Sequence, residues 1–199
     1  MQQLFTKTLR QVTRATLGSA LVLLAACGFS LDPGHIAGTG GDPGCLEGAK
    51  VELLRYSTLC ERTSSKRLLT EVHDGMEFTA EEVSTLESPC AEGPNPGVEV
   101  HVEHSSVIFD FSGVEQPGRF PRADFEGYVL DLILRGDNAL LVGATIDREA
   151  STLDLDNVDL SIDTERIELN FEDVAYDHLA LLKFDLHFST ARPRVDTQQ

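Results

Sequence analysis

Hydrophobic and polar residues alternate through most of the second half of the chain, and this period of two limits the fold more than any other feature. Val98, Val100 and Val102 alternate with Glu99, His101 and Glu103. Similar apolar runs follow at 109–111, 128–134, 140–142, 153–155, 158–162, 167–171 and 182–188. Such alternation is typical of strands that bury one face. The run 128–134 is apolar on both faces and predicts a central strand.

About eight strand-like runs at short spacing, with no long helical pattern between them, favour antiparallel pairing. We therefore predict a mainly β fold, an antiparallel β-sandwich or barrel-like domain over residues 98–189. A small mixed α/β segment, residues 45–97, precedes this domain and is expected to pack on it. Within that segment, Val51–Tyr56 fits either a strand or a helix, because a short apolar run does not distinguish them. Thr79 and Glu82 match a capping box, which predicts a short helix ending near Leu86.

A six-residue pattern occurs three times in the predicted β-domain. It consists of an apolar residue, Asp or Asn, an apolar residue, a small or acidic residue, then Gly, Asn or Asp, and finally Val. The three copies are residues 109–114, 153–158 and 169–174. The residue types at the fifth position tolerate positive φ best. We interpret each copy as a strand that bulges or turns and re-enters the core at its Val, rather than as a repeated binding motif.

The N-terminal residues have the form of an export signal. Lys7, Arg10 and Arg14 are accompanied by no acidic residue, and residues 15–26 are apolar or small. Twelve such residues are too few to span a bilayer, which needs about 20, and they fit a secretory signal instead. The run ends in Leu24-Ala25-Ala26-Cys27, which resembles the lipobox of bacterial lipoproteins: a Leu, two small residues and a Cys.

This resemblance implies that Cys27 becomes the first mature residue and carries a diacylglycerol and an N-acyl chain. One acyl chain binds a membrane only marginally, whereas two or more signals anchor it stably. Gly28 stands where an Asp retains lipoproteins at the inner membrane, so the resemblance implies a lipid-anchored protein of the bacterial cell envelope, at the outer membrane. Residues 28–44 contain six glycines and two prolines, a composition that predicts a flexible linker spanning roughly 20–25 Å.

The predicted organisation of the chain therefore has five parts. These are the signal peptide 1–26, the lipidated cysteine and linker 27–44, the mixed segment 45–97, the β-domain 98–189 and a disordered polar tail 190–199.

The charge of the chain restricts its partners. Without residues 1–26 the protein has 13 basic and 33 acidic residues, a formal charge of −20. Such a surface repels phosphate, so nucleic acid is not an expected partner. The membrane is expected to be reached through the lipid anchor, while the body stands away from anionic headgroups.

Three cysteines remain once Cys27 is lipidated: Cys45, Cys60 and Cys90. In an oxidising compartment they predict one disulfide and one thiol. Cys45 and Cys90 lie in turn-like contexts, whereas Cys60 ends an apolar run. This favours a Cys45–Cys90 pair with Cys60 buried, although the other pairings stay open.

Two groups of residues are candidate metal ligands. The first is the acidic cluster Asp154, Asp156, Asp159 and Asp163, a candidate for calcium, which takes six to eight oxygen ligands. We expect Asp154 and Asp156 to project from one strand. In a chain this acidic, solvated carboxylates are the favoured interpretation, and calcium binding is the alternative. The second group, Glu99, His101 and Glu103, shares one face of a strand and would need a further ligand from a neighbouring strand to bind a metal. A solvated strand face is the favoured interpretation of this group. His104 would point to the opposite face of that strand.

The sequence contains no phosphate-binding glycine loop, Gly-x-Ser-x-Gly elbow or His-Glu-x-x-His motif. The expected function is therefore that of a lipid-anchored envelope protein with a non-enzymatic binding or structural β-domain, whose partner is an envelope protein or a glycan. A calcium- or glycan-binding module is the first alternative, and a hydrolase with an acidic site is the second. No cofactor is expected, and calcium is the one candidate. The absence of Trp weakens the glycan interpretation, because sugar-binding surfaces favour exposed aromatic faces.

Overall fold

The computed structural model describes residues 46–59, 62–63, 66–73, 75–86, 96–134 and 140–189. The predicted signal peptide, linker and tail lie outside the described residues. So do Cys27, Cys45, Cys60 and Cys90, and the predictions of lipidation and disulfide pairing therefore stay predictions.

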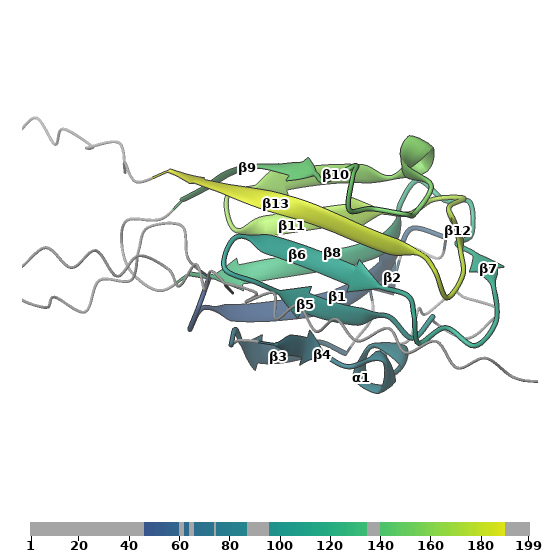
Figure 1. Ribbon diagram of the computed structural model, residues 1–199, viewed down its shortest axis with the longest axis horizontal. Helices are drawn as coiled ribbons and strands as arrows, with labels where there is room; N and C mark the ends of the chain where they lie inside the picture. The colour runs from purple at the N-terminus through teal and green to yellow at the C-terminus, as the bar shows by residue number, and fades with distance from the viewer. Residues whose placement is uncertain are drawn as a thin grey trace, which may run out of the picture.

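Two antiparallel sheets make up most of the described chain (Figure 1). The first sheet contains β1 (Lys50–Ser57), β2 (Arg62–Thr63), β3 (Leu68–Glu71), β8 (Glu126–Ile133), β10 (Asp159–Asp163) and β11 (Arg166–Asn170). The second sheet contains β4 (Met76–Phe78), β5 (Glu99–Val102), β6 (Ser106–Asp110), β9 (Leu140–Ile146) and β13 (Leu181–Ser189). The remaining elements are the two-stranded ribbon of β7 (Gly118–Arg119) and β12 (Ala175–Tyr176), the helix α1 (Ala80–Ser84) and the 3-10 helix η1 (Leu155–Asn157).

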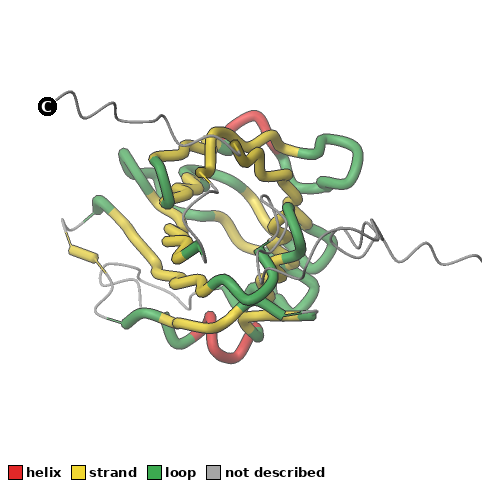
Figure 2. Tube along the Cα trace, turned by 90° about the vertical axis from the view of Figure 1, so that its left-hand side faces the viewer, coloured by secondary structure: helices red, strands yellow, loops and turns green. Residues whose placement is uncertain are grey.

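The strands of the first sheet follow the order β10-β11-β8-β1, with β2 and β3 both paired to the outer edge of β1. The order in the second sheet is β4-β5-β6-β13-β9. The two layers also meet at their edges, because β9 contacts β10 on one side and β3 contacts β4 on the other. Figure 2 views the strands of both layers along the long axis of the molecule. The mainly β, antiparallel fold predicted from the alternation is confirmed, as is the central position of β8.

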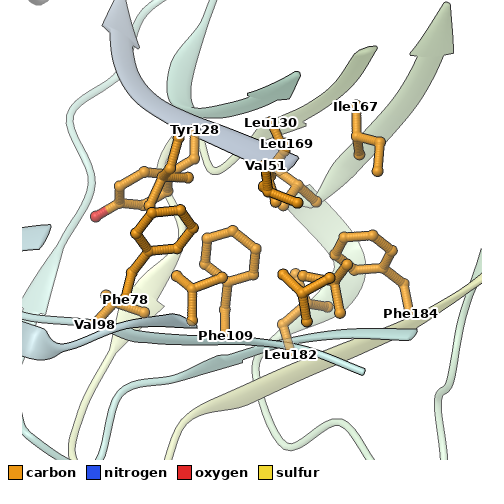
Figure 3. Close-up of a cluster of buried hydrophobic side chains, with 14 of the residues drawn as sticks. Val51, Phe78, Val98, Phe109, Tyr128, Leu130, Ile167, Leu169, Leu182 and Phe184 are labelled. Atoms are coloured by element: carbon orange, nitrogen blue, oxygen red, sulfur yellow. The ribbon is translucent and has the colours of Figure 1, made fainter. Parts of the chain in front are cut away.

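The core lies between the two sheets, whose apolar faces point toward each other (Figure 3). The first sheet contributes Val51, Tyr128, Leu130, Ile167 and Leu169, and the second contributes Phe109, Leu182 and Phe184, all fully buried. Burying one such side chain stabilises the fold by about 1.5–3 kcal/mol. The face opposite the core is more open, as in β5, where Val100 and Val102 are buried while Glu99 and His101 are partly exposed.

The segment 45–97 contributes strands to both sheets. β1 pairs with β8 from Lys50 to Ser57, so Val51–Tyr56 forms a strand, and β4 pairs with β5. The run in β1 was ambiguous because that strand is buried on both faces and shows no clean alternation. The predicted capping box is confirmed: the Glu82 amide donates to the Thr79 hydroxyl (3.2 Å) and the Thr79 amide to the Glu82 carboxylate (2.9 Å).

The strand predicted at 153–155 is wrong, because η1 begins at Leu155. The Asp154 carboxylate accepts the backbone N–H of Asp156 at 3.2 Å. A side chain that bonds the backbone in this way competes with strand pairing. Asp154 and Asp156 consequently do not project from one strand.

The three copies of the six-residue pattern share one local structure. In each copy the second side chain accepts the fourth backbone N–H, at 2.7 Å for Asp110–Ser112, 3.2 Å for Asp154–Asp156 and 3.1 Å for Asn170–Glu172. The N–H of the final Val then donates to the carbonyl of the third residue in all three copies. The prediction of a turn that returns to the core is confirmed.

The positive φ predicted at the fifth position of this pattern holds for Asp173, at 56°, but is wrong for Gly113 and Asn157. A turn closed from its third to its sixth residue is possible with negative φ at both central positions, as in type I turns. The pattern therefore specifies the turn but not the left-handed residue.

The sandwich has two distinct ends. At the near end the described chain begins, where the Leu46 N–H donates to the His104 carbonyl in the turn between β5 and β6. At the far end are the three six-residue turns, the ribbon of β7 and β12, and η1 (Figure 1). Among the described residues, no helix is long and apolar enough to cross a membrane.

Candidate functional site

Aromatic rings join the turns of the far end to the core. Phe171 lies 6.2 Å from Phe111 and 5.1 Å from Phe120, measured between ring centroids. Tyr176 on β12 lies 5.8 Å from Phe111 and 5.0 Å from Phe120. The Tyr176 ring also covers Gly118 on β7, where an added Cβ would lie 2.4 Å from the phenol oxygen. These contacts hold the far end as one packed unit.

Two open hollows lie on this unit. The first hollow has a volume of about 330 Å³, and its lining includes Thr152, Asp154, Tyr176, Asp177 and Leu179. Hydrogen bonds fix its rim, because the Thr152 hydroxyl donates to the Leu179 carbonyl at 2.6 Å and the Leu179 N–H donates to the Asp177 carboxylate at 2.8 Å. The Leu179 side chain itself remains 69 % exposed. The first hollow therefore offers a ligand one aromatic ring, one exposed aliphatic side chain and two carboxylates.

The second hollow has a volume of about 310 Å³ and is strongly polar. Its lining consists of Arg122, Asp156, Asn157, Asp159, Asn170, Glu172 and Asp173. Arg122 binds the Asp173 carboxylate through two nitrogens, at 2.9 and 2.7 Å, and Arg119 binds the same carboxylate at 3.2 Å. The hydrogen bond from Arg122 is the main cause that lowers the pKa of Asp173. Asp173 is therefore already neutralised by protein cations, whereas Asp156, Asp159 and Glu172 leave the hollow acidic.

The four predicted calcium ligands are distributed over three places. Asp154 lines the first hollow, Asp156 and Asp159 line the second, and Asp163 ends β10 at the near end. No three of these carboxylates lie within 4.8 Å of one another. Asp159 and Asp163 are four residues apart on a strand and so are separated by about 13 Å. The structure thus brings two of the four aspartates into one hollow.

A buried ion pair lies beneath the far end. The Arg55 guanidinium of β1 donates to the Glu126 carboxylate of β8, and the two side chains are 2 % and 0 % exposed. The guanidinium carbon also lies 4.9 Å from the Phe120 centroid and 4.8 Å from that of Tyr128. Contact with two ring faces stabilises the cation. Three atoms of the pair, Arg55 Nε and Nη1 and Glu126 Oε2, have no hydrogen-bond partner among the described residues.

The ion pair and the hollows are separate features, because neither Arg55 nor Glu126 lines either hollow. Of the two tyrosines near the pair, Tyr128 is fully buried and Tyr176 is partly buried. Burial raises the pKa of Tyr128 to about 12 and also raises the pKa of Tyr176. These groups stay neutral near neutral pH, so we assign the ion pair and its rings to the support of the far end rather than to chemistry on a ligand.

Sequence reasoning missed several of these residues. Arg55 and Glu126 lie in β1 and β8, which are rich in apolar residues but also contain the charged residues Lys50, Glu52 and Asp131. The sequence therefore gave only a weak signal that these two charges are buried. Tyr176 and Leu179 lie in a short stretch without clear alternation, which gave no signal. The first hollow is formed by turns that are more than 20 residues apart in the sequence. The residue pattern of any one segment does not show which distant turns will lie side by side.

Comparisons of this chain with protein-family models, with curated proteins and with solved structures give no match.

Proposed function

We propose that this chain is a lipid-anchored, non-enzymatic binding domain of the bacterial cell envelope, which binds its partner at the far end of the β-sandwich. The observation that carries the proposal is that the chain enters the fold at one end while both hollows lie at the other. Leu46, the first described residue, bonds to His104 at the near end. An anchor at Cys27 with a linker over 28–44 would therefore leave the far end free to face away from the membrane.

The chemistry of the first hollow supports a binding role. Tyr176 and Leu179 provide apolar contact area, and Asp154 and Asp177 provide acceptors for hydrogen bonds. A hollow that combines apolar walls with a few fixed polar groups is typical of ligand sites. The surrounding carboxylates favour a neutral or positively charged partner, either a segment of an envelope protein or a glycan with free hydroxyl groups.

The anchor is tested by changing Cys27 to Ala. The variant should move from the membrane fraction to the soluble fraction while its far-UV circular dichroism retains the β signature. A variant that stays in the membrane fraction would show that another segment anchors the protein.

The binding end is tested in cells by photo-crosslinking. A photoreactive amino acid in place of Leu179 samples the rim of the first hollow, and the same amino acid in place of Thr164 samples an exposed turn at the near end. We expect crosslinked products from position 179 and few or none from position 164. Equal products from both positions would contradict a partner at the far end, even if the anchor test succeeds.

Calcium binding is a second candidate function, favoured by the second hollow. Asp156, Asp159 and Glu172 offer carboxylate oxygens there, and the side chain of Asn157 offers a carbonyl oxygen. Oxygen donors of this kind are the ligands that calcium prefers. A calcium site in this hollow should raise the melting temperature in millimolar calcium and lose that gain in EDTA. Asp156→Asn should abolish the gain, and a melt that calcium does not change would exclude the candidate.

A further inference from the structure

We propose that Glu99, His101 and Asp110 form a binding site for a divalent transition-metal cation, with zinc as the expected ion, on the outer face of the second sheet. The site is separate from both hollows and goes beyond the proposed function. A metal here requires a ligand from a strand beside β5, and β6 supplies it: Glu99 is paired directly with Asp110 in the antiparallel register.

The three side chains converge because of strand geometry. Residues two apart on a strand share a face, which places His101 next to Glu99. Directly paired residues on neighbouring strands bring their side chains close together, which places Asp110 opposite Glu99. One ligand atom from each residue lies within 4.8 Å of the other two. His101 Nε2 and Glu99 Oε2 are 3.9 Å apart, so small side-chain rotations would bring all three atoms to the distances of one ion.

The surroundings leave these groups available. The side chains of Glu99 and His101 are 31 % and 29 % exposed, so they are partly desolvated but accessible. Asp110 uses one carboxylate oxygen, Oδ1, to accept the Ser112 N–H at 2.7 Å, and Oδ2 is the oxygen that remains for an ion. Fixing a ligating carboxylate by such a second bond is a common feature of metal sites. Lys183 on the adjacent β13 does not neutralise the site, because its ammonium lies 3.8 Å from Asp147.

Other acidic side chains near the site do not complete it. Glu77 on β4 is close to His101, but its two carboxylate oxygens accept the backbone N–H groups of Val102 and His73. Glu103 lies beyond the end of β5, and its carboxylate accepts the Ser106 hydroxyl at 2.9 Å. The proposed ligand set is therefore one imidazole and two carboxylates.

The donor types indicate the class of metal. Calcium and magnesium take oxygen ligands almost exclusively, whereas an imidazole nitrogen suits zinc and its first-row neighbours. Two carboxylates would balance the charge of a dication. Three protein ligands also leave a fourth position, which in zinc proteins is filled by water or by a group of a ligand.

The test measures zinc affinity by competition with a chromophoric chelator, on full-length detergent-solubilised protein purified without a histidine tag. We expect one zinc ion per chain in the wild type. His101→Gln, Glu99→Gln and Asp110→Asn should each weaken binding at least about tenfold. Asp110→Asn is the sharpest variant, because an Asn side chain can still accept the Ser112 N–H and keep the turn. His187→Gln is the matched control, since His187 lies on the same sheet and contacts Thr145 instead.

The cysteines of the chain require a second readout, because thiolates also bind zinc. Cobalt should bind the wild type without the intense sulfur charge-transfer absorption of a thiolate site, and its visible spectrum should be lost in His101→Gln. The proposal is overturned if the wild type binds no zinc, if all three ligand variants keep the wild-type affinity, or if cobalt shows thiolate absorption that the variants leave unchanged.

Discussion

The buried ion pair of Arg55 and Glu126 makes the stability of this fold sensitive to a single substitution. Both charges are removed from water, and three of their polar atoms have no hydrogen-bond partner among the described residues. Removing one member of such a pair leaves an uncompensated charge in the interior, whereas replacing both members by apolar residues is often neutral.

We therefore expect Arg55→Met and Glu126→Leu each to lower the free energy of unfolding by about 3–5 kcal/mol. The double variant should lie closer to the wild type than either single variant, because no unpaired charge remains. Urea unfolding of the four proteins gives the coupling energy. Additive losses in the double variant would show that the two side chains act through packing alone.

The buried phenol of Tyr128 should make the stability of the protein depend on pH in the alkaline range. Burial raises its pKa from 10 to about 12, so the folded state holds the phenol proton more tightly than the unfolded state. Stability contributed by a proton held in this way is lost as the pH rises from about 10 to about 12. We expect Tyr128→Phe to lose less stability over this interval than the wild type, in chemical denaturation at both pH values. Equal losses of stability in the wild type and in Tyr128→Phe would show that the Tyr128 phenol is not the source of the pH dependence.

Strand pairing depends on a close approach at Gly127. A Cβ at this position of β8 would lie 1.8 Å from the Leu169 carbonyl oxygen of β11, and a backbone atom cannot move aside as a flexible side chain can. Gly127→Ala should therefore separate the two strands and lower the melting temperature sharply, or prevent folding. Gly143→Ala on β9 is the matched control, because its Cβ would meet only His187 at an ordinary 3.5 Å. Similar melting temperatures for both variants would show that β11 can shift at little cost.

The hairpin between β10 and β11 contains a strained residue. Thr164 has a φ of 55° at the first position of the two-residue loop between Asp163 and Arg166. A left-handed conformation costs an L-residue about 1–2 kcal/mol, and turns of this form prefer Gly at that position. Thr164→Gly should raise the free energy of unfolding by about 1 kcal/mol in urea titrations. Ser161→Gly in the middle of β10 is the control and should lower the free energy of unfolding by about 0.5–1 kcal/mol. If both variants lose stability, Thr164 is not strained.

The elements could be predicted from the sequence wherever one face of a strand is buried and the other is solvated. The runs at 158–162, 167–171 and 182–188 form β10, β11 and β13 for this reason. Prediction stayed open for β1, where both faces are buried, and failed at Leu153–Leu155, where the Asp154 side chain bonds the backbone instead. These are the places at which a strand pattern alone carries too little information.

The candidate sites were less predictable, because they depend on which strands become neighbours. The acidic cluster was recognised by composition, but the turn at Asp154 and the length of β10 disperse its members. The need for a ligand from a neighbouring strand beside His101 was clear from the alternation. That Asp110 is this ligand follows only from the register of β5 with β6.

At the scale of the whole molecule, net charge should dominate the response to salt. The chain without residues 1–26 has a formal charge of −20, and like charges repel one another more in the compact state than in the unfolded chain. Raising sodium chloride from about 0.01 M to about 0.1 M shortens the Debye length from about 30 Å to about 10 Å. We expect this change to increase the free energy of unfolding, measured by urea titration.

The second hollow allows the source of this effect to be located. Asp156→Asn combined with Asp159→Asn removes two charges from a cluster that also contains Glu172, and should reduce the salt dependence. Ser161→Asn on the same strand changes no charge and should leave the salt dependence as in the wild type. A fall in the free energy of unfolding with added salt would contradict the prediction. It would mean that attractive ion pairs such as Arg166–Asp131, at 2.7 Å, outweigh the repulsion among the carboxylates.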